Sequence, residues 1–258
     1  MKYHLDTIPV WDAMKLDGEC LLCALARKIE LGEAERYLGA SVMEPDTRIQ
    51  VNEKGFCTKH HAMLYQMSNR LGHALMLESH LVRTRERMKK VQETLLKQAD
   101  TLEKAPLGKL SRGGRDAKSE IEESGKKLAQ MAESCIMCDS IQEIVNRYLH
   151  TFFHLYKNDA EFRTRFENSK GVCLPHMADL VKVCCEELSA KESAAFLRML
   201  CQMETKNMDR MQEDISWFIK KFDYRYQNEP WKQSQDAVPR TVNKLRSYCV
   251  GDEPNPEE

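Results

Sequence analysis

The sequence predicts an all-α fold built from two similar halves. Along most of the chain, apolar residues recur every three or four positions, which is the spacing of one face of an α-helix. No segment alternates apolar and polar residues in the way that a half-buried strand does. A cysteine-rich motif also occurs twice, once in each half of the 258 residues. We therefore expect duplicated helical repeats, each clamped by one metal site.

The repeated motif is a Cys-x-x-Cys pair followed by a Cys-x-x-His pair. The two pairs are separated by 33 residues in the first copy and by 34 in the second. Three thiolates and one imidazole form a complete tetrahedral ligand set for a structural zinc ion. The predicted ligands are Cys20, Cys23, Cys57 and His60 in the first half, and Cys135, Cys138, Cys173 and His176 in the second. Cysteines buried simply as small apolar side chains are the plainer alternative, but this alternative leaves the repeated histidine unexplained.

The predicted cofactor is zinc, with two ions, one in each half. Four protein ligands fill the coordination sphere of zinc and leave no position for an activated water, which argues against hydrolytic catalysis. An iron–sulfur cluster is the alternative cofactor, because three cysteines and one histidine also hold such clusters. His61 directly follows His60 and is an alternative ligand, but the register of the second copy, which ends in His176, favours His60.

The first half, residues 1–105, is expected to contain two long helices. The first follows Cys23 and runs for about six turns until Pro45 and a polar run end it. The second follows the Cys57 pair and carries one continuous apolar stripe, which only Gly72 interrupts. Residues 106–116 combine a proline, three glycines and basic side chains, so we expect a linker between the halves there.

The second half, residues 117–248, is expected to repeat this organisation and to add C-terminal helices. Its expected helices are a charged segment at 117–133, a segment carrying Ile141 to Phe153, a short segment capped by Asn158 and Asp159, a segment starting at Cys173, and segments at 190–226 and 236–247. Pro175 fits the first turn of its helix, where the missing N–H would have no partner in any case. Residues 249–258 are acidic and contain proline, so we expect a disordered tail.

Each ligand pair is expected at the start of a helix. The two-residue gap then lets both side chains of a pair converge on one ion from the first turn. The positive end of the helix dipole also lowers the pKa of a thiol and favours the ligating thiolate. One ion would therefore join two helix starts that lie more than thirty residues apart in the chain.

Composition indicates a soluble protein with locally recognised partners. The formal net charge is −1, and no segment is long and apolar enough for a membrane span or a signal-peptide core. We expect the cytoplasm, where ten cysteines favour metal binding over disulfides. Residues 83–127 carry thirteen basic and eight acidic side chains without interleaved aromatic residues, so we expect no nucleic-acid partner. The expected partner is an unidentified protein or small molecule.

Three segments together resemble a family of uncharacterised bacterial proteins described as a domain of unknown function. They are the Thr7-Ile-Pro-Val10 approach to the Gly18-Glu-Cys-Leu-Leu-Cys23 segment, the Gly55-Phe-Cys-Thr-Lys-His60 turn, and the run from Trp217 to Tyr226. The resemblance covers nearly the whole chain. It implies the duplicated cysteine–histidine architecture and brings no assigned activity.

The run from Lys221 to Tyr226 has two interpretations. It combines Asp223, Arg225 and two tyrosines near a helix end, and so offers charge and aromatic hydrogen-bonding groups for recognition. The favoured interpretation is structural: a buried ion pair that anchors the C-terminal helix against the core.

The functional prediction is an intracellular binding or regulatory module rather than an enzyme. No nucleophile motif, phosphate-binding glycine loop or paired-carboxylate signature occurs in the sequence. The alternatives are an iron–sulfur redox protein and an enzyme with a pocket between the halves, near the run from Lys221 to Tyr226.

Overall fold

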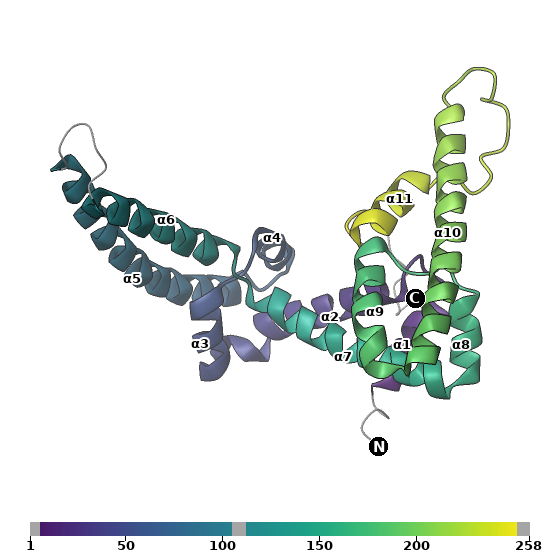
Figure 1. Ribbon diagram of the computed structural model, residues 1–258, viewed down its shortest axis with the longest axis horizontal. Helices are drawn as coiled ribbons and strands as arrows, with labels where there is room; N and C mark the ends of the chain where they lie inside the picture. The colour runs from purple at the N-terminus through teal and green to yellow at the C-terminus, as the bar shows by residue number, and fades with distance from the viewer. Residues whose placement is uncertain (1–5, 105–111, 252–258) are drawn as a thin grey trace. The chain divides into compact units, whose positions relative to one another are not determined.

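The computed structural model describes residues 6–104 and 112–251, and across these ranges it is all-α, as predicted (Figure 1). The described residues form eleven α-helices and one 3-10 helix, with no strand. The helices are α1 (Thr7–Lys15), α2 (Leu21–Leu38), η1 (Ala40–Met43), α3 (Pro45–Lys54), α4 (Thr58–Gln66), α5 (Arg70–Glu103), α6 (Arg112–Glu133), α7 (Ile136–Asn158), α8 (Ala160–Glu167), α9 (Leu174–Glu187), α10 (Ala190–Lys220) and α11 (Ala237–Arg246).

The chain divides into two compact units that differ from the two halves expected from the sequence. Unit 1 comprises residues 1–29 and 142–258, and unit 2 comprises residues 30–141. Both α2 and α7 contribute one end to each unit. The expected linker at 106–116 falls within unit 2, where α6 begins at Arg112 and residues 105–111 lie outside the described part.

Unit 1 is organised around a cluster of aromatic side chains. Phe152 of α7 packs edge-to-face against Phe166 of α8, with ring centroids 4.7 Å apart. Phe153 and Phe196 bring α7 against α10 in the same way, with centroids 5.1 Å apart. All four side chains are almost fully buried. Because aromatic side chains bury large apolar areas, this cluster holds α7, α8 and α10 together.

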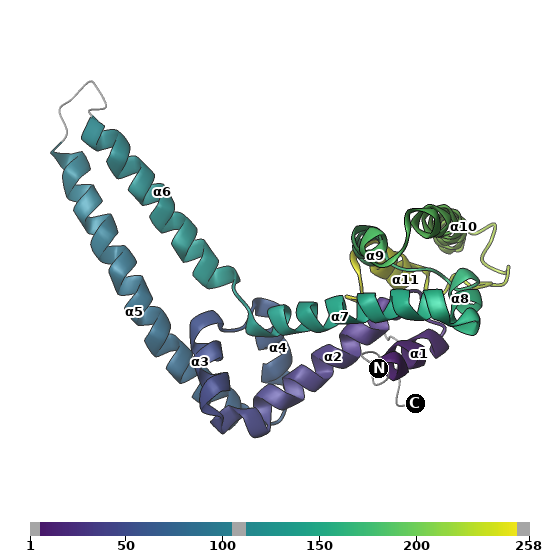
Figure 2. The ribbon, with the colours of Figure 1, turned by 60° about the horizontal axis from the view of Figure 1, so that its bottom comes forward.

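Unit 2 combines a small core with a long helical hairpin. The core packs Tyr37 of α2 against Phe56, and Leu64 of α4 and Met76 of α5 complete it. Beyond this core, α5 and α6 run side by side in opposite directions (Figure 2). This hairpin is the longest element of unit 2.

Several helix boundaries differ from the sequence prediction for identifiable reasons. Pro45 occupies the first turn of α3 instead of ending a helix, because its missing N–H costs nothing at that position. The apolar stripe that begins at Leu64 was expected to lie on one continuous helix, but the helix is interrupted at residues 67–69. There the Asn69 side chain accepts a hydrogen bond from the Gly72 N–H and caps α5. The long C-terminal helix α10 ends at Lys220 rather than near Tyr226.

Other expected helices are confirmed. Asp159 caps α8 by accepting hydrogen bonds from two backbone N–H groups, and Pro175 lies in the first turn of α9. The first helix, α1, was not predicted. Residues 252–258 of the expected tail lie outside the described part of the chain. Among the helices of residues 6–104 and 112–251, none has the length and apolar character needed to cross a membrane.

Candidate metal centres

The eight predicted ligand residues gather into two Cys3His groups, but the pairs combine differently from the prediction. Group 1 consists of Cys20, Cys23, Cys173 and His176, and group 2 consists of Cys57, His60, Cys135 and Cys138. In each group the four ligand atoms lie within 4.8 Å of one another. The expected assignment of one group to each sequence repeat is therefore corrected. The Cys-x-x-Cys pair of each copy meets the Cys-x-x-His pair of the other.

The helix starts explain this exchange. Cys57 and Cys173 are the N-cap residues of α4 and α9, whereas Cys20 and Cys135 directly precede α2 and α7. The start of α2 belongs to unit 1 together with α9, and the start of α7 belongs to unit 2 together with α4. Each unit therefore contains one complete group, and each group joins two helix starts, as the sequence predicted.

Group 1 has the dimensions of a tetrahedral site. Nδ1 of His176 lies 3.1 Å from Sγ of Cys173, 3.3 Å from that of Cys20 and 3.5 Å from that of Cys23. The sulfurs of Cys23 and Cys173 are 3.6 Å apart. Zinc bonds of about 2.3 Å to sulfur and about 2.0 Å to nitrogen imply S···S and S···N separations of about 3.8 and about 3.5 Å. A single ion therefore fits between these four atoms.

Group 2 has nearly the same geometry. Nδ1 of His60 lies 3.1 Å from Sγ of Cys135, 3.4 Å from that of Cys57 and 3.5 Å from that of Cys138. Sγ of Cys57 is 3.7 Å from Sγ of Cys138. The cysteines of these two sulfur–sulfur pairs are all free. Their sulfur–sulfur distances far exceed the disulfide bond length of about 2.05 Å. Both groups therefore have the spacing of metal ligands rather than of cross-links.

The side chains within each group shift one another's pKa values strongly. Burial disfavours the charged imidazole of His60, but hydrogen bonds with Cys135 and Glu30 outweigh it and raise its pKa to about 9. Burial also disfavours the charged imidazole of His176, but hydrogen bonds with Cys173 and Cys23 outweigh this effect and raise its pKa to about 10. Burial opposes ionisation of Cys135, yet the bond with His60 lowers its pKa to about 6. In each group one thiolate, that of Cys135 or Cys173, and the neighbouring imidazolium thus stabilise each other. A metal ion that binds there displaces the protons that the ligands still carry.

Group 2 has a carboxylate behind its histidine. Oε1 of Glu30 lies 3.1 Å from Nε2 of His60, and Glu30 is 4% exposed. A hydrogen bond donated by Nε2–H fixes the tautomer in which Nδ1 faces the three sulfurs without a proton. Lys59 also contacts the same carboxylate oxygen, at 2.5 Å. Sequence reasoning missed Glu30, because nothing in its position on α2 distinguishes it from neighbouring acidic residues.

A glycine with positive φ precedes each Cys-x-x-His pair by two residues. Gly55 has φ +63° and Gly171 has φ +79°, a region that side-chain-bearing residues rarely adopt. A Cβ on Gly171 would stand 2.2 Å from a carboxylate oxygen of Glu204, and one on Gly55 would clash with the His80 ring. These glycines let the chain turn into the ligand pair, so the Gly-apolar-Cys-x-x-His pattern is part of each group.

A buried ion pair holds the turn of group 1. Glu204 of α10 accepts a hydrogen bond from the Val172 N–H at 2.6 Å and pairs with Lys244 of α11 at 2.9 Å. Lys244 in turn donates to the carbonyl of Lys170 at 2.8 Å and is 2% exposed. The pair therefore satisfies both sides of the Gly171 turn immediately before Cys173. Sequence reasoning missed this ion pair, because Glu204 and Lys244 lie far from the motif in the chain.

The two groups differ in exposure. All four residues of group 1 are buried, whereas in group 2 Cys138 is exposed and Cys57 is half-buried. Group 2 is therefore open to solvent at Cys138 and partly at Cys57, whereas group 1 is enclosed.

Two further candidates lie outside the groups. His61, the alternative ligand, instead contacts His73, with Nδ1 and Nε2 3.1 Å apart. Cys249 is exposed and free, as expected.

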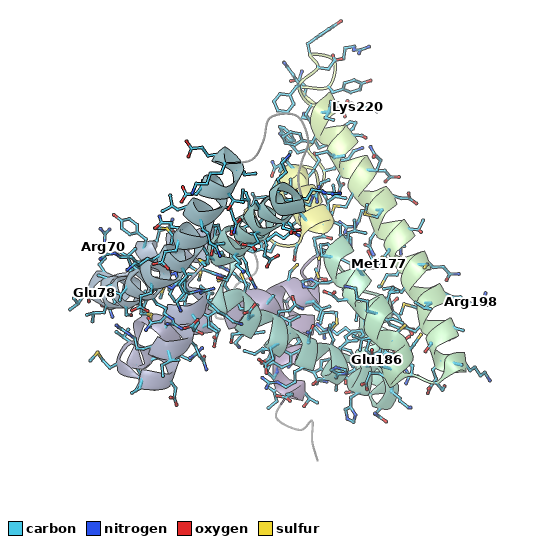
Figure 3. All side chains as sticks on the ribbon, turned by 60° about the vertical axis from the view of Figure 1, so that its left-hand side comes forward. Arg70, Glu78, Met177, Glu186, Arg198 and Lys220 are labelled. Carbon is cyan, nitrogen blue, oxygen red and sulfur yellow. The ribbon has the colours of Figure 1, made fainter. Side chains whose placement is uncertain are left out.

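The run from Lys221 to Tyr226 forms a turn organised by Lys221. Its buried ammonium group donates to the carbonyls of Tyr226 and Gln227 at 2.8 and 2.7 Å and also to that of Glu229. Arg225 and Asp223 do form an ion pair, as the structural interpretation expected. Both residues lie within the turn, however, and the Arg225 side chain is 64% exposed. The expectation that this pair is buried and anchors the helix is therefore wrong. Lys220 marks the start of this turn in Figure 3.

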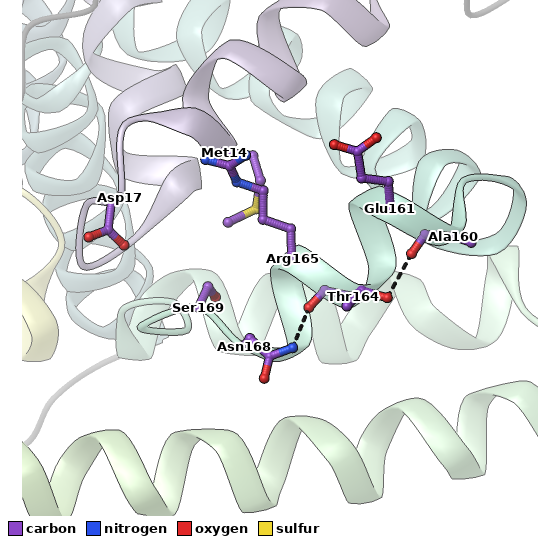
Figure 4. A pocket seen from close by; sticks show the side chains of 8 residues that line it. All are labelled: Met14, Asp17, Ala160, Glu161, Thr164, Arg165, Asn168 and Ser169. Atoms are coloured by element: carbon purple, nitrogen blue, oxygen red, sulfur yellow. Dashed lines mark hydrogen bonds between the residues drawn. The ribbon is translucent and has the colours of Figure 1, made fainter.

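Unit 1 also has an open pocket of about 670 Å³ between α1 and α8 (Figure 4). It is lined by Met14, Asp17, Ala160, Glu161, Thr164, Arg165, Asn168 and Ser169. Thr164 and Asn168 donate their side-chain hydrogen bonds to carbonyls of α8 itself, and Asp17 pairs with Lys170. The lining holds neither cysteine nor histidine, so this pocket is separate from both groups.

Comparison with models of protein families gives a match over nearly the whole chain. The family model described as "Family of unknown function (DUF6062)" matches residues 1–252, which confirms the resemblance found in the sequence. No curated protein and no solved structure matches the chain.

Proposed function

The chain belongs to the family of unknown function DUF6062, and we propose that it is a non-catalytic module whose two units are each held together by a structural zinc ion. The observation that carries this proposal is the convergence of four ligand atoms within 4.8 Å in both groups. Three thiolates and one imidazole are a typical zinc ligand set, and four protein ligands leave no position for a reactive water.

Within each unit, zinc would act as a clamp between two helix starts. In group 1 it would join α2 to α9, and in group 2 it would join α4 to α7. Structural zinc contributes on the order of 10 kcal/mol to the folding of small domains, which is comparable to the whole stability of a typical domain. The ion would therefore decide whether each unit folds.

An iron–sulfur cluster is the second candidate for these groups, and the geometry favours zinc over it. The four protein ligands of a cluster are divided among at least two iron atoms, so they cannot all lie as close to one another as the four ligands of a single ion. In both groups, by contrast, all four ligand atoms lie within 4.8 Å of one another.

We place this module in the cytoplasm and assign it a binding or regulatory role towards a protein or a small molecule. An exposed apolar surface at the end of α10 supports a binding role: Ile219, Phe222 and Tyr224 are 65%, 71% and 81% exposed. The Lys221 turn holds these side chains in the solvent without using them in the core.

Elemental analysis of the purified full chain tests the metal assignment. We expect two zinc ions per chain, no iron and no visible absorption. Removal of zinc by a chelator should lower the helix signal in circular dichroism, and added zinc should restore it. A brown protein containing iron and sulfide would establish the cluster, and a metal-free protein with unchanged helix content would refute a structural metal.

A further inference from the structure

The hairpin of α5 and α6 is held by a narrow seam of small and polar side chains. The residues that face the partner helix recur every seven positions: Val91 and Gln98 on α5, and Ala117 and Ser124 on α6, all at most 6% exposed. Gln98 also donates a hydrogen bond to Glu120 across the seam. Seven-residue spacing is typical of helices that pack along their length, but these four side chains bury little apolar area.

One flank of this seam is apolar on both helices. On α5, Met88 lies three positions before Val91 and Leu95 lies four positions after it. On α6, Ile121 and Leu128 lie at the same distances before and after Ser124. On α5 the flank extends at seven-residue spacing to Leu81 and Leu102. We call these six side chains the apolar flank. Leu81 is 68% exposed, Met88 40% and Leu128 38%, and the other three are half-buried.

The opposite flank is polar. On α5, Arg87 lies four positions before Val91 and Thr94 lies three positions after it. On α6, Glu120 and Lys127 lie at the same distances before and after Ser124. In an antiparallel pair, equal offsets from the seam fall on the same side of the plane through the two helix axes. The apolar residues of α5 and α6 therefore share one side of the hairpin, along the parallel lengths seen in Figure 2, and the charged residues share the other.

We propose that the apolar flank is the interface of a homodimer, in which the hairpins of two copies form a four-helix bundle. The flank is about 30 Å long and about two helices wide, or roughly 600 Å² in each copy. Two such faces bury about 1,200 Å², the lower end of the range for specific interfaces.

A second copy fits this face because the face is complementary to itself. Both of its helices carry apolar residues at seven-residue spacing, so a twofold rotation places equivalent rows against each other. Its borders carry both signs of charge, with Glu78 and Arg85 on α5 and Lys118 and Glu122 on α6. Two copies can therefore meet without a uniform like-charge repulsion. Glu78 is labelled on α5 in Figure 3.

The test is the mass of the full chain in solution, measured by light scattering during size-exclusion chromatography. We expect about 60 kDa for the wild type, twice the 30.0 kDa of one chain. The double variant Leu81→Glu/Met88→Glu should raise the dimer dissociation constant by on the order of 100-fold, because each new carboxylate would be buried in the interface. Both positions are exposed in the single chain, so helix content should not change.

The matched control is Val82→Glu/Leu96→Glu, which places the same charges one residue after Leu81 and Leu95. Val82 and Leu96 are 56% and 69% exposed and point about 100° away from the flank, so this variant should remain dimeric. A monomeric wild type, or equal masses for the two variants, would overturn the proposal. Zinc content is measured on the same samples. Because the flank contains no predicted ligand, two ions per chain are expected whether or not the dimer forms.

Discussion

His60 and His176 both direct Nδ1 at three sulfurs, but the two groups are supported by different neighbours. Glu30 contacts Nε2 of His60 from within the core of unit 2. In group 1 the corresponding support acts on the backbone, through the Glu204 contact with the Val172 N–H next to Cys173. Two groups with the same ligands are therefore held in place by different neighbours.

Replacement of Glu30 should weaken zinc binding in group 2 alone. In Glu30→Gln the charge that orients His60 is lost, and the affinity of one of the two ions should fall about 10- to 100-fold, as is typical when such a hydrogen-bond partner is removed. Competition with a zinc-binding dye measures this. Glu35→Gln, at an exposed position of the same helix, is the control. Equal affinities in the two variants would contradict a role for Glu30.

Gly171 should not tolerate a side chain, whereas Gly32 should. Gly171→Ala requires both a positive φ and the displacement of Glu204, so we expect a loss of more than about 1 kcal/mol in the free energy of unfolding. Gly32 lies within α2 with open space around its Cα, so Gly32→Ala should stabilise the protein by about 0.5–1 kcal/mol. Denaturant titration of both variants compares them. The same effect in both variants would contradict a steric requirement for glycine at position 171.

At the scale of helices, the sequence predicted the helix boundaries that depend on residues at the boundary itself. The starts of α8 and α9 follow from a capping aspartate and a first-turn proline, and all four ligand pairs lie at helix starts. The end of α10 was missed because it depends on the Lys221 ammonium reaching carbonyls five to eight residues later. The interruption at Asn69 was missed because the apolar stripe continues through it.

Single ligand substitutions should act on one unit. Cys57→Ser removes a ligand of group 2, so we expect one zinc ion per chain instead of two and a loss of helix content confined to unit 2. Hydrogen exchange followed by mass spectrometry locates the loss. Cys249→Ser, at an exposed free cysteine, should leave metal content and exchange unchanged. Equal zinc content in both variants and wild type would refute the ligand assignment.

The two ions should leave at different rates. Cys138 of group 2 is exposed, whereas all of group 1 is buried, so a chelator reaches group 2 first. We expect zinc release in two phases of one ion each, with the fast phase absent from Cys57→Ser. A single phase that releases both ions at the same rate would contradict this difference in access.

At the scale of the whole molecule, the ligand pairs are nested in the chain. The outermost pairs form group 1 and the inner pairs form group 2, and the hairpin of α5 and α6 lies between the two inner pairs. The sequence predicted the eight residues but not this pairing. Spacing is nearly equal in the two copies, and proximity along the chain favours the wrong combination. The two solutions are separated by the tertiary structure, in which α2 and α7 each contribute residues to both units.

Zinc should make stability depend on pH. Its ligands bind zinc only when deprotonated, so the folded zinc form carries fewer protons than the unfolded chain, and the free energy of unfolding falls as pH falls. Between about pH 8 and pH 5 we expect a steeper decline of Tm with zinc bound than after chelation. Parallel curves in the two conditions would argue against zinc as the source of the stability.

The most direct test of the central claim is the zinc content of two double variants. Cys20→Ser/Cys173→Ser removes two ligands of group 1 and should retain one ion per chain, whereas Cys20→Ser/Cys57→Ser disables both groups and should retain none. If the first variant lost both ions while the second kept one, the ligands would pair within each sequence repeat, and the nested arrangement would be wrong.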